Sequence, residues 1–177
     1  MKPFKDSKHT KAGARFYVDQ AISDDTAVID LPKEITKHAL SSLRLKEGIL
    51  FHIFNGKGGE YLCKLILPQN ENATAEIIDY ERPNTESSLD ICLAQSYLSN
   101  EKMNFLIQKA TELGINEINI FKSERSSFKV DKDQLNKKKV HWNKVAIAAC
   151  EQSGRTRIPK IETFQSLESL ISGPSAS

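Results

Sequence analysis

The heptapeptide EQSGRTR, which begins at Glu151, carries more polar chemistry than a connector between two elements requires. The residues before it have the period of an amphipathic helix, and those after it look like a strand. Gly154 and one arginine suit a helix C-cap, which leaves Glu151, Gln152 and the other arginine unexplained. Because guanidinium groups donate paired hydrogen bonds to phosphate or carboxylate, Arg155 and Arg157 indicate either a plain cap or an anion-contacting site.

Two further groups of polar residues are candidates for binding. The loop KSERSSFK contains Glu124 and Arg125 and follows a predicted strand. Parallel sheets bind ligands beyond the carboxyl ends of their strands, so this loop is either part of a site or an ordinary solvated loop. In the first half of the chain, basic residues predict either ordinary surface charge or a basic face: Arg15, Arg44, Lys46, Lys57 and Lys64.

Bulk composition indicates a globular protein and excludes several classes. The 177 residues are 39% hydrophobic and 27% charged, with a formal net charge of only +2. Charge over the whole chain therefore does not indicate a nucleic-acid binder, and only local clustering of basic residues would. Three widely spaced cysteines disfavour a disulfide framework and favour a reducing, cytoplasmic location. We expect no metal site and no membrane span, since ligand spacing and long apolar runs are lacking.

The first half of the sequence reads as a basic arm followed by a small β-barrel. Residues 1–14 contain four lysines against one aspartate, and are either a solvated tail or an arm that touches phosphates. Residues 15–82 combine one helix, at 32–45, with strands at 15–19, 26–31, 49–55, 60–67 and 73–80. Two of these strands form a hairpin with a glycine-rich turn, which lacks the spacing of a phosphate loop. Barrels of this kind often bind RNA.

The second half has a different order of predicted elements, in which strands alternate with helices. The polar, proline-containing residues 83–88 are the predicted linker. Residues 89–177 then alternate strands, at 89–95, 115–121 and 157–164, with helices, at 100–114, 134–154 and 166–171. This order calls for a parallel sheet covered by helices on both faces. Three strands are few for such a domain, so we expect it to be incomplete or completed by a partner chain.

Several motifs occur in an order that resembles one bacterial family. They are HALSSLRLKEG, FNGKGGEY, KMNFLIQKATELGI, SERS and EQSGRTRIP. From about Arg15 to about Leu170, the chain is similar to the RsmE family of small-subunit ribosomal RNA (uracil-N3) methyltransferases. QKATELG and EQSGRTR are the specific motifs, whereas FNGKGGEY is less so.

The resemblance implies a two-domain α+β protein. A PUA-like β-barrel that binds RNA would precede an α/β SPOUT domain, a fold with a deep trefoil knot. Members of the superfamily bind S-adenosylmethionine in the knot and act as homodimers with the active site at the interface. The family continues into a glycine-rich loop that builds the knot, whereas this sequence ends in Gly-Pro-Ser-Ala-Ser. We therefore expect the knot region and the cofactor-binding residues to be missing.

The implied activity is S-adenosylmethionine-dependent methylation of N3 of a uridine in 16S ribosomal RNA or the small ribosomal subunit. Our candidate catalytic residues, chosen for the polar crowding in EQSGRTR, are Arg125 and Arg155, as stabilisers of the uracil anion, and Glu151, as base or orienter. The expected RNA contacts are Arg15, Arg44, Lys46, Lys57, Glu124, Gln152 and Arg157. The alternative is a non-catalytic RNA-binding module or remnant. A generic α/β domain is a third reading, and it predicts no salt-dependent RNA affinity.

Overall fold

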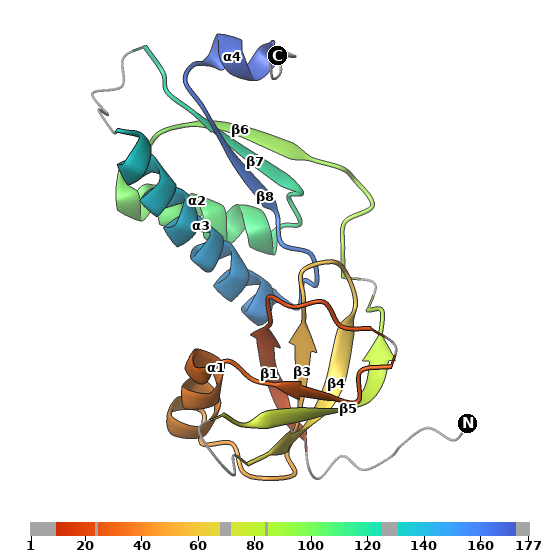
Figure 1. The fold of residues 1–177 in the computed structure, drawn as a ribbon. Coiled ribbons are helices and arrows are strands. Elements are labelled where there is room, and N and C mark those ends of the chain that lie inside the picture. Colours follow the sequence, from red (N-terminus) through yellow and green to blue (C-terminus); the bar gives the residue numbers. More distant parts are fainter. Residues whose placement is uncertain (1–9, 24, 68–71, 84, 125–130, 173–177) are drawn as a thin grey trace. The chain divides into compact units, whose positions relative to one another are not determined.

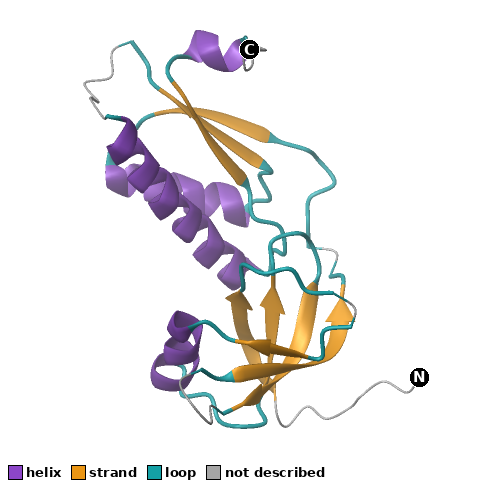
Figure 2. Ribbon diagram, in the orientation of Figure 1, coloured by secondary structure: helices purple, strands orange, loops and turns teal. Residues whose placement is uncertain are grey.

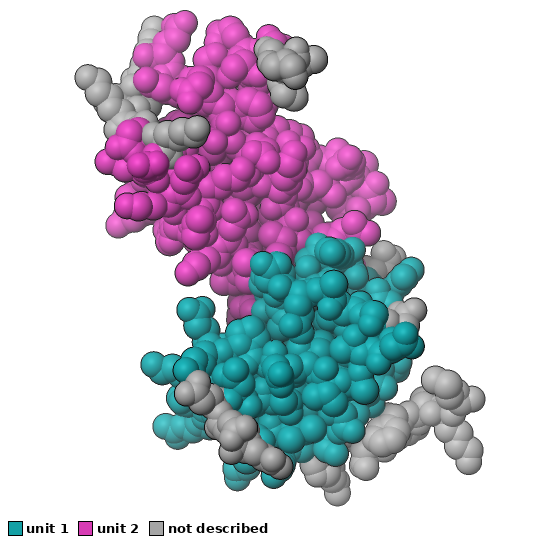
Figure 3. Space-filling view, viewed as in Figure 1, with its two compact units in different colours: residues 1–84 teal, residues 85–177 magenta. Residues whose placement is uncertain are grey.

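The computed structural model describes residues 10–23, 25–67, 72–83, 85–124 and 131–172 (Figure 1). The chain divides into unit 1, Met1–Asn84, and unit 2, Thr85–Ser177 (Figure 3). This boundary lies inside the predicted linker, so residues 85–88 belong to unit 2. The physical reason is that Thr85 and Glu86 hydrogen-bond to later residues of unit 2.

Unit 1 contains a single mixed sheet (Figure 2). Its strands are β1 (Thr10–Tyr17), β2 (Val28–Asp30), β3 (Leu50–Phe54), β4 (Glu60–Ile66) and β5 (Thr74–Glu81), in the order β1-β3-β4-β5-β2. β1 runs parallel to β3, and the other neighbours are antiparallel. β1 and β2 stand at the two ends of this order, so the predicted barrel is open between them.

The start of β1 corrects one prediction. β1 begins at Thr10, whereas residues 1–14 were expected to form a basic arm. Residues 10–14 are therefore strand: Thr10 pairs with Leu50, and after an irregularity regular pairing with β3 resumes at Arg15 opposite His52. Residues 1–9 of the predicted arm lie outside the described residues.

All five strands of unit 1 contribute to one hydrophobic core. Its members include Phe16, Ile29, Phe51, Leu65 and Ala75, one from each strand. A helical segment packs against the same core: α1 (Lys33–Lys37) passes into a π-helical turn, η1 (His38–Ser42). Strand alternation places Cys63 inside as well, where burial raises the pKa of its thiol to about 12. All three cysteines are free, as expected.

The glycine-rich turn joins β3 to β4, as the sequence predicted. Gly56, Gly58 and Gly59 have φ of 78°, 98° and 77°, which L side chains rarely adopt. The ring of Tyr80 lies against Gly59, where a Cβ atom would come 2.2 Å from the tyrosine oxygen. Tyr80 in turn donates a hydrogen bond to the Gly58 carbonyl, at 3.4 Å. These glycines thus serve turn geometry and a close packing contact, not phosphate binding.

Unit 2 is a parallel sheet with helices in the crossovers. Its strands are β6 (Cys92–Ser96), β7 (Glu117–Phe121) and β8 (Lys160–Phe164), in the order β6-β7-β8. Its helices are α2 (Asn100–Glu112), α3 (Lys132–Ser153) and α4 (Leu167–Ile171). Asp131 caps α3 by accepting a hydrogen bond from the Gln134 N–H, at 2.8 Å. All six elements occur in the predicted order, with strands that begin two to three residues later.

The expectation of helices on both faces of this sheet is wrong for the two long helices. α2 and α3 pack together on the same face (Figure 1). They share one core with β7: Met103 and Ile107 from α2, Trp142 from α3, and Ile118 and Ile120 from β7. The reason is topological. Two right-handed crossovers that advance in the same direction along a sheet place both helices on one side.

The other face of β7 carries a polar residue. Asn119 is 6% exposed, and its Nδ2 donates to the Cys92 Sγ at 3.0 Å. Its Oδ1 is buried and has no partner among the described residues. Such a group is costly to leave unpaired. Within the part of the chain that the structure describes, no helix is long and apolar enough to cross a membrane.

Two glycines with similar φ provide a test of the packing in unit 1. Replacing Gly48, φ 79°, by Ala adds strain but no clash, because nothing lies within 4 Å of the new Cβ. We expect it to destabilise unit 1 by about 1 kcal/mol. Gly59→Ala must also displace the Tyr80 ring, so its cost should be greater by roughly 1–3 kcal/mol. Thermal unfolding followed by circular dichroism measures both, and equal losses would contradict the packing role of Gly59.

Candidate functional site

The heptapeptide 151–157 forms the last turn of α3 and the start of the loop to β8. Gly154 ends the helix with φ 83°, and its N–H donates to the Cys150 carbonyl at 3.2 Å. The predicted helix C-cap is therefore confirmed. Glu151 is half-buried, whereas Gln152 is exposed. The cap explains the glycine alone, so the other polar residues need their own account.

This loop and the loop containing Glu124 lie at opposite edges of the sheet. β7 and β8 are parallel, with Glu117 paired to Lys160 and Phe121 to Phe164. The heptapeptide precedes β8 and so lies at the amino-terminal edge. Glu124 follows β7, is exposed, and lies beyond the carboxyl-terminal edge. The structure therefore does not bring Glu124 near the heptapeptide within one chain, and Arg125 lies outside the described residues.

Arg155 is buried and holds three parts of unit 2 together. The residue is 2% exposed. Its Nε and Nη2 donate to one carboxylate oxygen of Glu86, at 3.1 and 2.7 Å. Its Nη1 donates to the carbonyls of Thr111 and Ile115, both at 2.9 Å, where α2 ends. The guanidinium thus places positive charge at the negative end of a helix, which stabilises it.

The second carboxylate oxygen of Glu86 organises the loop after α3. It accepts hydrogen bonds from the N–H groups of Thr156 and Arg157, both at 3.1 Å. The neighbouring Thr85 hydroxyl donates to the carbonyl of Gly154 at 3.1 Å. Glu86 and Arg155, which we call the clamp, therefore fix the path of the chain from α3 to β8. Both oxygens of the carboxylate are in use.

Sequence reasoning did not find Glu86, because it lies in a segment whose composition indicates a linker. Its partner is 69 residues away along the chain. The one available signal was indirect: an arginine in a small, polar motif needs a counter-charge if it is buried.

The clamp changes the interpretation of the heptapeptide. Arg155 uses its donors within unit 2, and its burial is that of a structural group. The prediction that Arg155 is catalytic stays a prediction, and the geometry favours a positioning role. Arg157 is exposed in the loop after α3, and Gln152 and Ser153 are exposed in the last turn of the helix.

Arg15 is also engaged within the protein. Its Nε and Nη2 donate to the Glu60 carboxylate at 2.9 and 2.7 Å, and its side chain is 9% exposed. Its guanidinium also lies over the Phe54 ring, 5.0 Å from the centroid. The predicted RNA contact at Arg15 is untested, but this placement is that of a residue that joins β1 to the β3–β4 hairpin.

The other predicted RNA contacts of unit 1 fall into two separate places. Lys57 is exposed on the turn that follows β3. Arg44 and Lys46 are exposed before β3, near Gly48, whose N–H donates to the Leu65 carbonyl at the far end of β4. The β3–β4 hairpin thus separates Lys57 from the other two. The predicted single basic face is not assembled, and Lys64 is paired with Glu76 at 3.5 Å.

Strand pairing creates one cluster that the sequence did not indicate. His52, Glu60 and Glu81 offer ligand atoms that lie within 4.8 Å of one another. They come from β3, β4 and β5, so only the sheet register brings them together. The Arg15 guanidinium already supplies positive charge to Glu60, which is what a cation at this place would otherwise provide.

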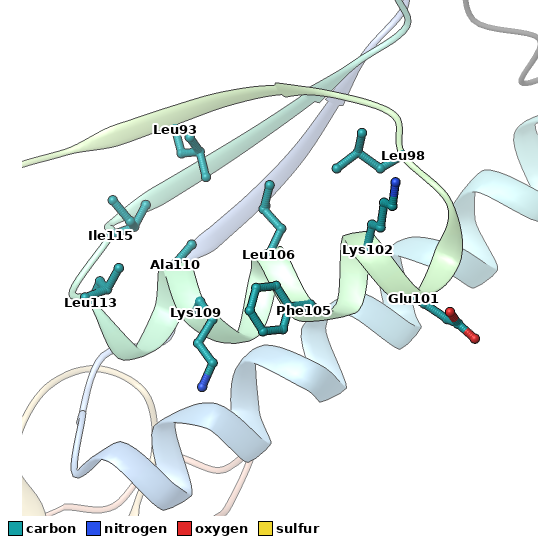
Figure 4. A pocket seen from close by; sticks show the side chains of 10 residues that line it. All are labelled: Leu93, Leu98, Glu101, Lys102, Phe105, Leu106, Lys109, Ala110, Leu113 and Ile115. Carbon is teal, nitrogen blue, oxygen red and sulfur yellow. The ribbon is translucent and has the colours of Figure 1, made fainter.

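Unit 2 contains a hollow of about 690 Å³ between α2 and β6 (Figure 4). Its lining is almost wholly apolar and includes Leu93, Leu98, Leu106, Ala110 and Ile115. The side chains of Glu101 and Lys109 point away from the gap between helix and sheet. Binding sites for polar cofactors combine an apolar wall with a few convergent polar groups. Among the described lining residues, Lys102 alone extends a charged group toward Leu98, so the hollow has the apolar wall without a convergent set of polar groups (Figure 4).

The clamp can be tested through the only tryptophan of the chain, Trp142, which is buried in unit 2. Glu86→Gln leaves the Arg155 guanidinium buried without its counter-charge. We expect a loss of about 3 kcal/mol in the free energy of unfolding. We choose the low end of the range of stability losses for breaking a buried ion pair, because 20% of the Glu86 side chain is exposed to solvent. Urea unfolding followed by tryptophan fluorescence measures it.

Glu112→Gln is the matched control. Glu112 pairs with Lys109 at 2.7 Å on the surface of α2, and that pairing lowers the pKa of its carboxyl. Surface pairs contribute little, so the urea midpoint of this variant should stay close to that of the parent. A Glu86→Gln variant as stable as the control would show that unit 2 does not depend on the clamp.

Comparison with known proteins identifies both units. The family model described as RNA methyltransferase domain matches residues 85–176, and the model described as RNA methyltransferase PUA domain matches residues 31–78. Ribosomal RNA small subunit methyltransferase E of Buchnera aphidicola (subsp. Schizaphis graminum) is 34% identical over 160 residues. This match covers 84% of the chain and 65% of the relative. The protein of the same name from Bacillus subtilis is 26% identical, over 84% of the chain and 58% of the relative.

Solved structures agree with these matches. Ribosomal RNA small subunit methyltransferase E of Neisseria gonorrhoeae, bound to S-adenosyl methionine, superposes with a TM-score of 0.82 at 34% identity. A putative methyltransferase of Legionella pneumophila, also with bound cofactor, has a TM-score of 0.82 at 29% identity. Both matches cover 92% of this chain and 66% of the other. The chain thus spans slightly less than two thirds of its relatives, and it belongs to the RNA methyltransferase family, with a PUA domain followed by a methyltransferase domain.

Proposed function

We propose that this protein serves the S-adenosylmethionine-dependent methylation of N3 of a uridine in 16S ribosomal RNA. The observation that carries the proposal is the joint match of both units, in one order, to relatives that are named small-subunit ribosomal RNA methyltransferases. The neighbour from Neisseria gonorrhoeae was solved with S-adenosyl methionine bound. The choice of N3 and of 16S RNA is the finer part of the proposal and rests on the sequence motifs.

The chemistry sets requirements for the residues. N3 of uracil lies on the Watson–Crick edge and carries a proton, so the base must be exposed and the proton removed. The uracil anion that forms needs positive charge or hydrogen-bond donors near O2 or O4. We propose Glu151 as the base or its orienter and Arg125 as a stabiliser of the anion. For Arg155 we propose a positioning role, in which the clamp holds the loop that presents Arg157 and that follows Gln152 at the end of α3.

A second copy of the chain is part of the proposal. Glu124 lies beyond one edge of the unit 2 sheet, and the heptapeptide lies at the other. One chain cannot place both against the same uridine. A homodimer that sets the carboxyl-terminal edge of one copy beside the amino-terminal edge of the other would do so.

The described residues do not fit S-adenosylmethionine by themselves. The cofactor has a charged amino acid portion and a ribose, which need polar partners, and the hollow beside α2 is apolar. We propose that those partners come from a part of the protein that corresponds to the third of the relatives which this chain does not span. The second candidate function is a module that binds ribosomal RNA without catalysis, and the match of residues 31–78 to the RNA methyltransferase PUA domain supports it.

Deletion of the gene provides the test in the cell. We expect N3-methyluridine to disappear from 16S ribosomal RNA, as measured by mass spectrometry of nuclease fragments, and to return when the gene is supplied again. Full retention of the modified nucleoside in the deletion strain would remove the proposed activity. Return of the modification with a gene whose product lacks S-adenosylmethionine binding would instead favour the module.

A further inference from the structure

Arg44 has a backbone conformation that its residue type disfavours. Its φ is 52°, and it is the only residue other than glycine with positive φ in the described part of the chain. A side chain in this left-handed region costs about 1–2 kcal/mol, because its Cβ approaches the following carbonyl. Such outliers persist where the surrounding structure enforces them, and they are often associated with function.

The end of the helical segment enforces this conformation. The Leu43 N–H donates to the His38 carbonyl at 3.0 Å, and the Leu45 N–H donates to the Ala39 carbonyl at 2.9 Å. This is the pattern of a helix end in which the residue between the two donors turns left-handed, a position usually held by glycine. Leu43 and Leu45 pack against the core of unit 1, so Arg44 is fixed from both sides.

The Arg44 side chain makes no polar contact with the described residues that would offset this strain. Arg44 is exposed, and it makes no hydrogen bond or ion pair with any residue that the structure describes. Lys46, two residues later, is exposed in the same way. Backbone hydrogen bonds nonetheless hold the loop: the Gly48 N–H donates to the Leu65 carbonyl at 2.8 Å, and the Ile49 N–H donates to the Lys46 carbonyl at 3.2 Å. A guanidinium on such a loop loses little backbone entropy when it binds a partner.

We propose that Arg44 is a phosphate contact of unit 1 for ribosomal RNA, with Lys46 beside it, and that the RNA contact is the reason for an arginine where glycine would be more stable. The inference rests on the proposed function as an RNA methyltransferase. Arginine suits this role because its planar fork donates two hydrogen bonds to one phosphate. Lys57 is not part of this contact, because the β3–β4 hairpin separates it from Arg44. Arg15 is not part of it either, because its guanidinium is paired with Glu60.

Three substitutions separate strain from charge. Arg44→Gly removes both, so its melting temperature should rise by a few degrees while its RNA affinity falls by roughly tenfold. Arg44→Ala removes the charge but keeps a Cβ atom on the left-handed backbone. Its RNA affinity should fall as much as in Arg44→Gly, whereas its melting temperature should not rise. Arg44→Lys keeps the charge but not the fork, and should retain part of the affinity. Lys137→Ala, which removes an exposed charge on α3, is the control and should change neither quantity.

The measurement is fluorescence anisotropy of the 177-residue chain with a labelled hairpin from small-subunit RNA, over a series of KCl concentrations. The slope of log affinity against log salt should decrease by about one in Arg44→Gly and Arg44→Ala. Unchanged affinity and slope in both variants, with a parent that binds, would overturn the role of Arg44 and leave the proposed function standing. Equal losses in Lys137→Ala would also overturn it. A parent without salt-dependent affinity would overturn RNA binding itself.

Discussion

The buried ion pair between Glu86 and Arg155 is the constraint on which the amino-terminal edge of unit 2 depends. It joins the first residues of the unit, the end of α2 and the loop after α3 at one point. A charge that is 3% exposed is stable there only because a carboxylate and the carbonyls of Thr111 and Ile115 surround it. The packing of α2 against α3 fixes how the helices lie on the sheet, whereas the clamp fixes the path of the chain from α3 to β8.

Much of the fold follows from local sequence. The period of Met103, Ile107 and Ala110 predicted α2, and alternation in 60–67 predicted β4, because each pattern is set by neighbours within a few residues. The helix end at Gly154 and the glycine-rich turn could be predicted from the sequence for the same reason. The face of the sheet on which the helices lie could not be predicted. That depends on the order β6-β7-β8, which no short segment encodes.

The candidate site was harder to predict from the sequence than the fold, because a motif specifies residue types but not the groups that surround them in the structure. Arg15 and Arg155 have the sequence context of arginines that contact an anion, and each does contact one. The anion is a carboxylate of the protein itself, 45 or 69 residues away. Arg44 shows the opposite case: an ordinary surface arginine in the sequence, marked as unusual only by its backbone angle. Long-range pairing and backbone strain were the missing information in these cases.

The position of Glu86 has a consequence for how such proteins can be rearranged. The first two residues after the boundary between the units donate or accept hydrogen bonds within the second unit. Composition would suggest that two modules can be exchanged anywhere within the polar, proline-containing stretch. Recombination downstream of Glu86 would instead separate the methyltransferase unit from part of its own support. A chimera that keeps the methyltransferase unit intact should therefore have its crossover on the amino-terminal side of Thr85.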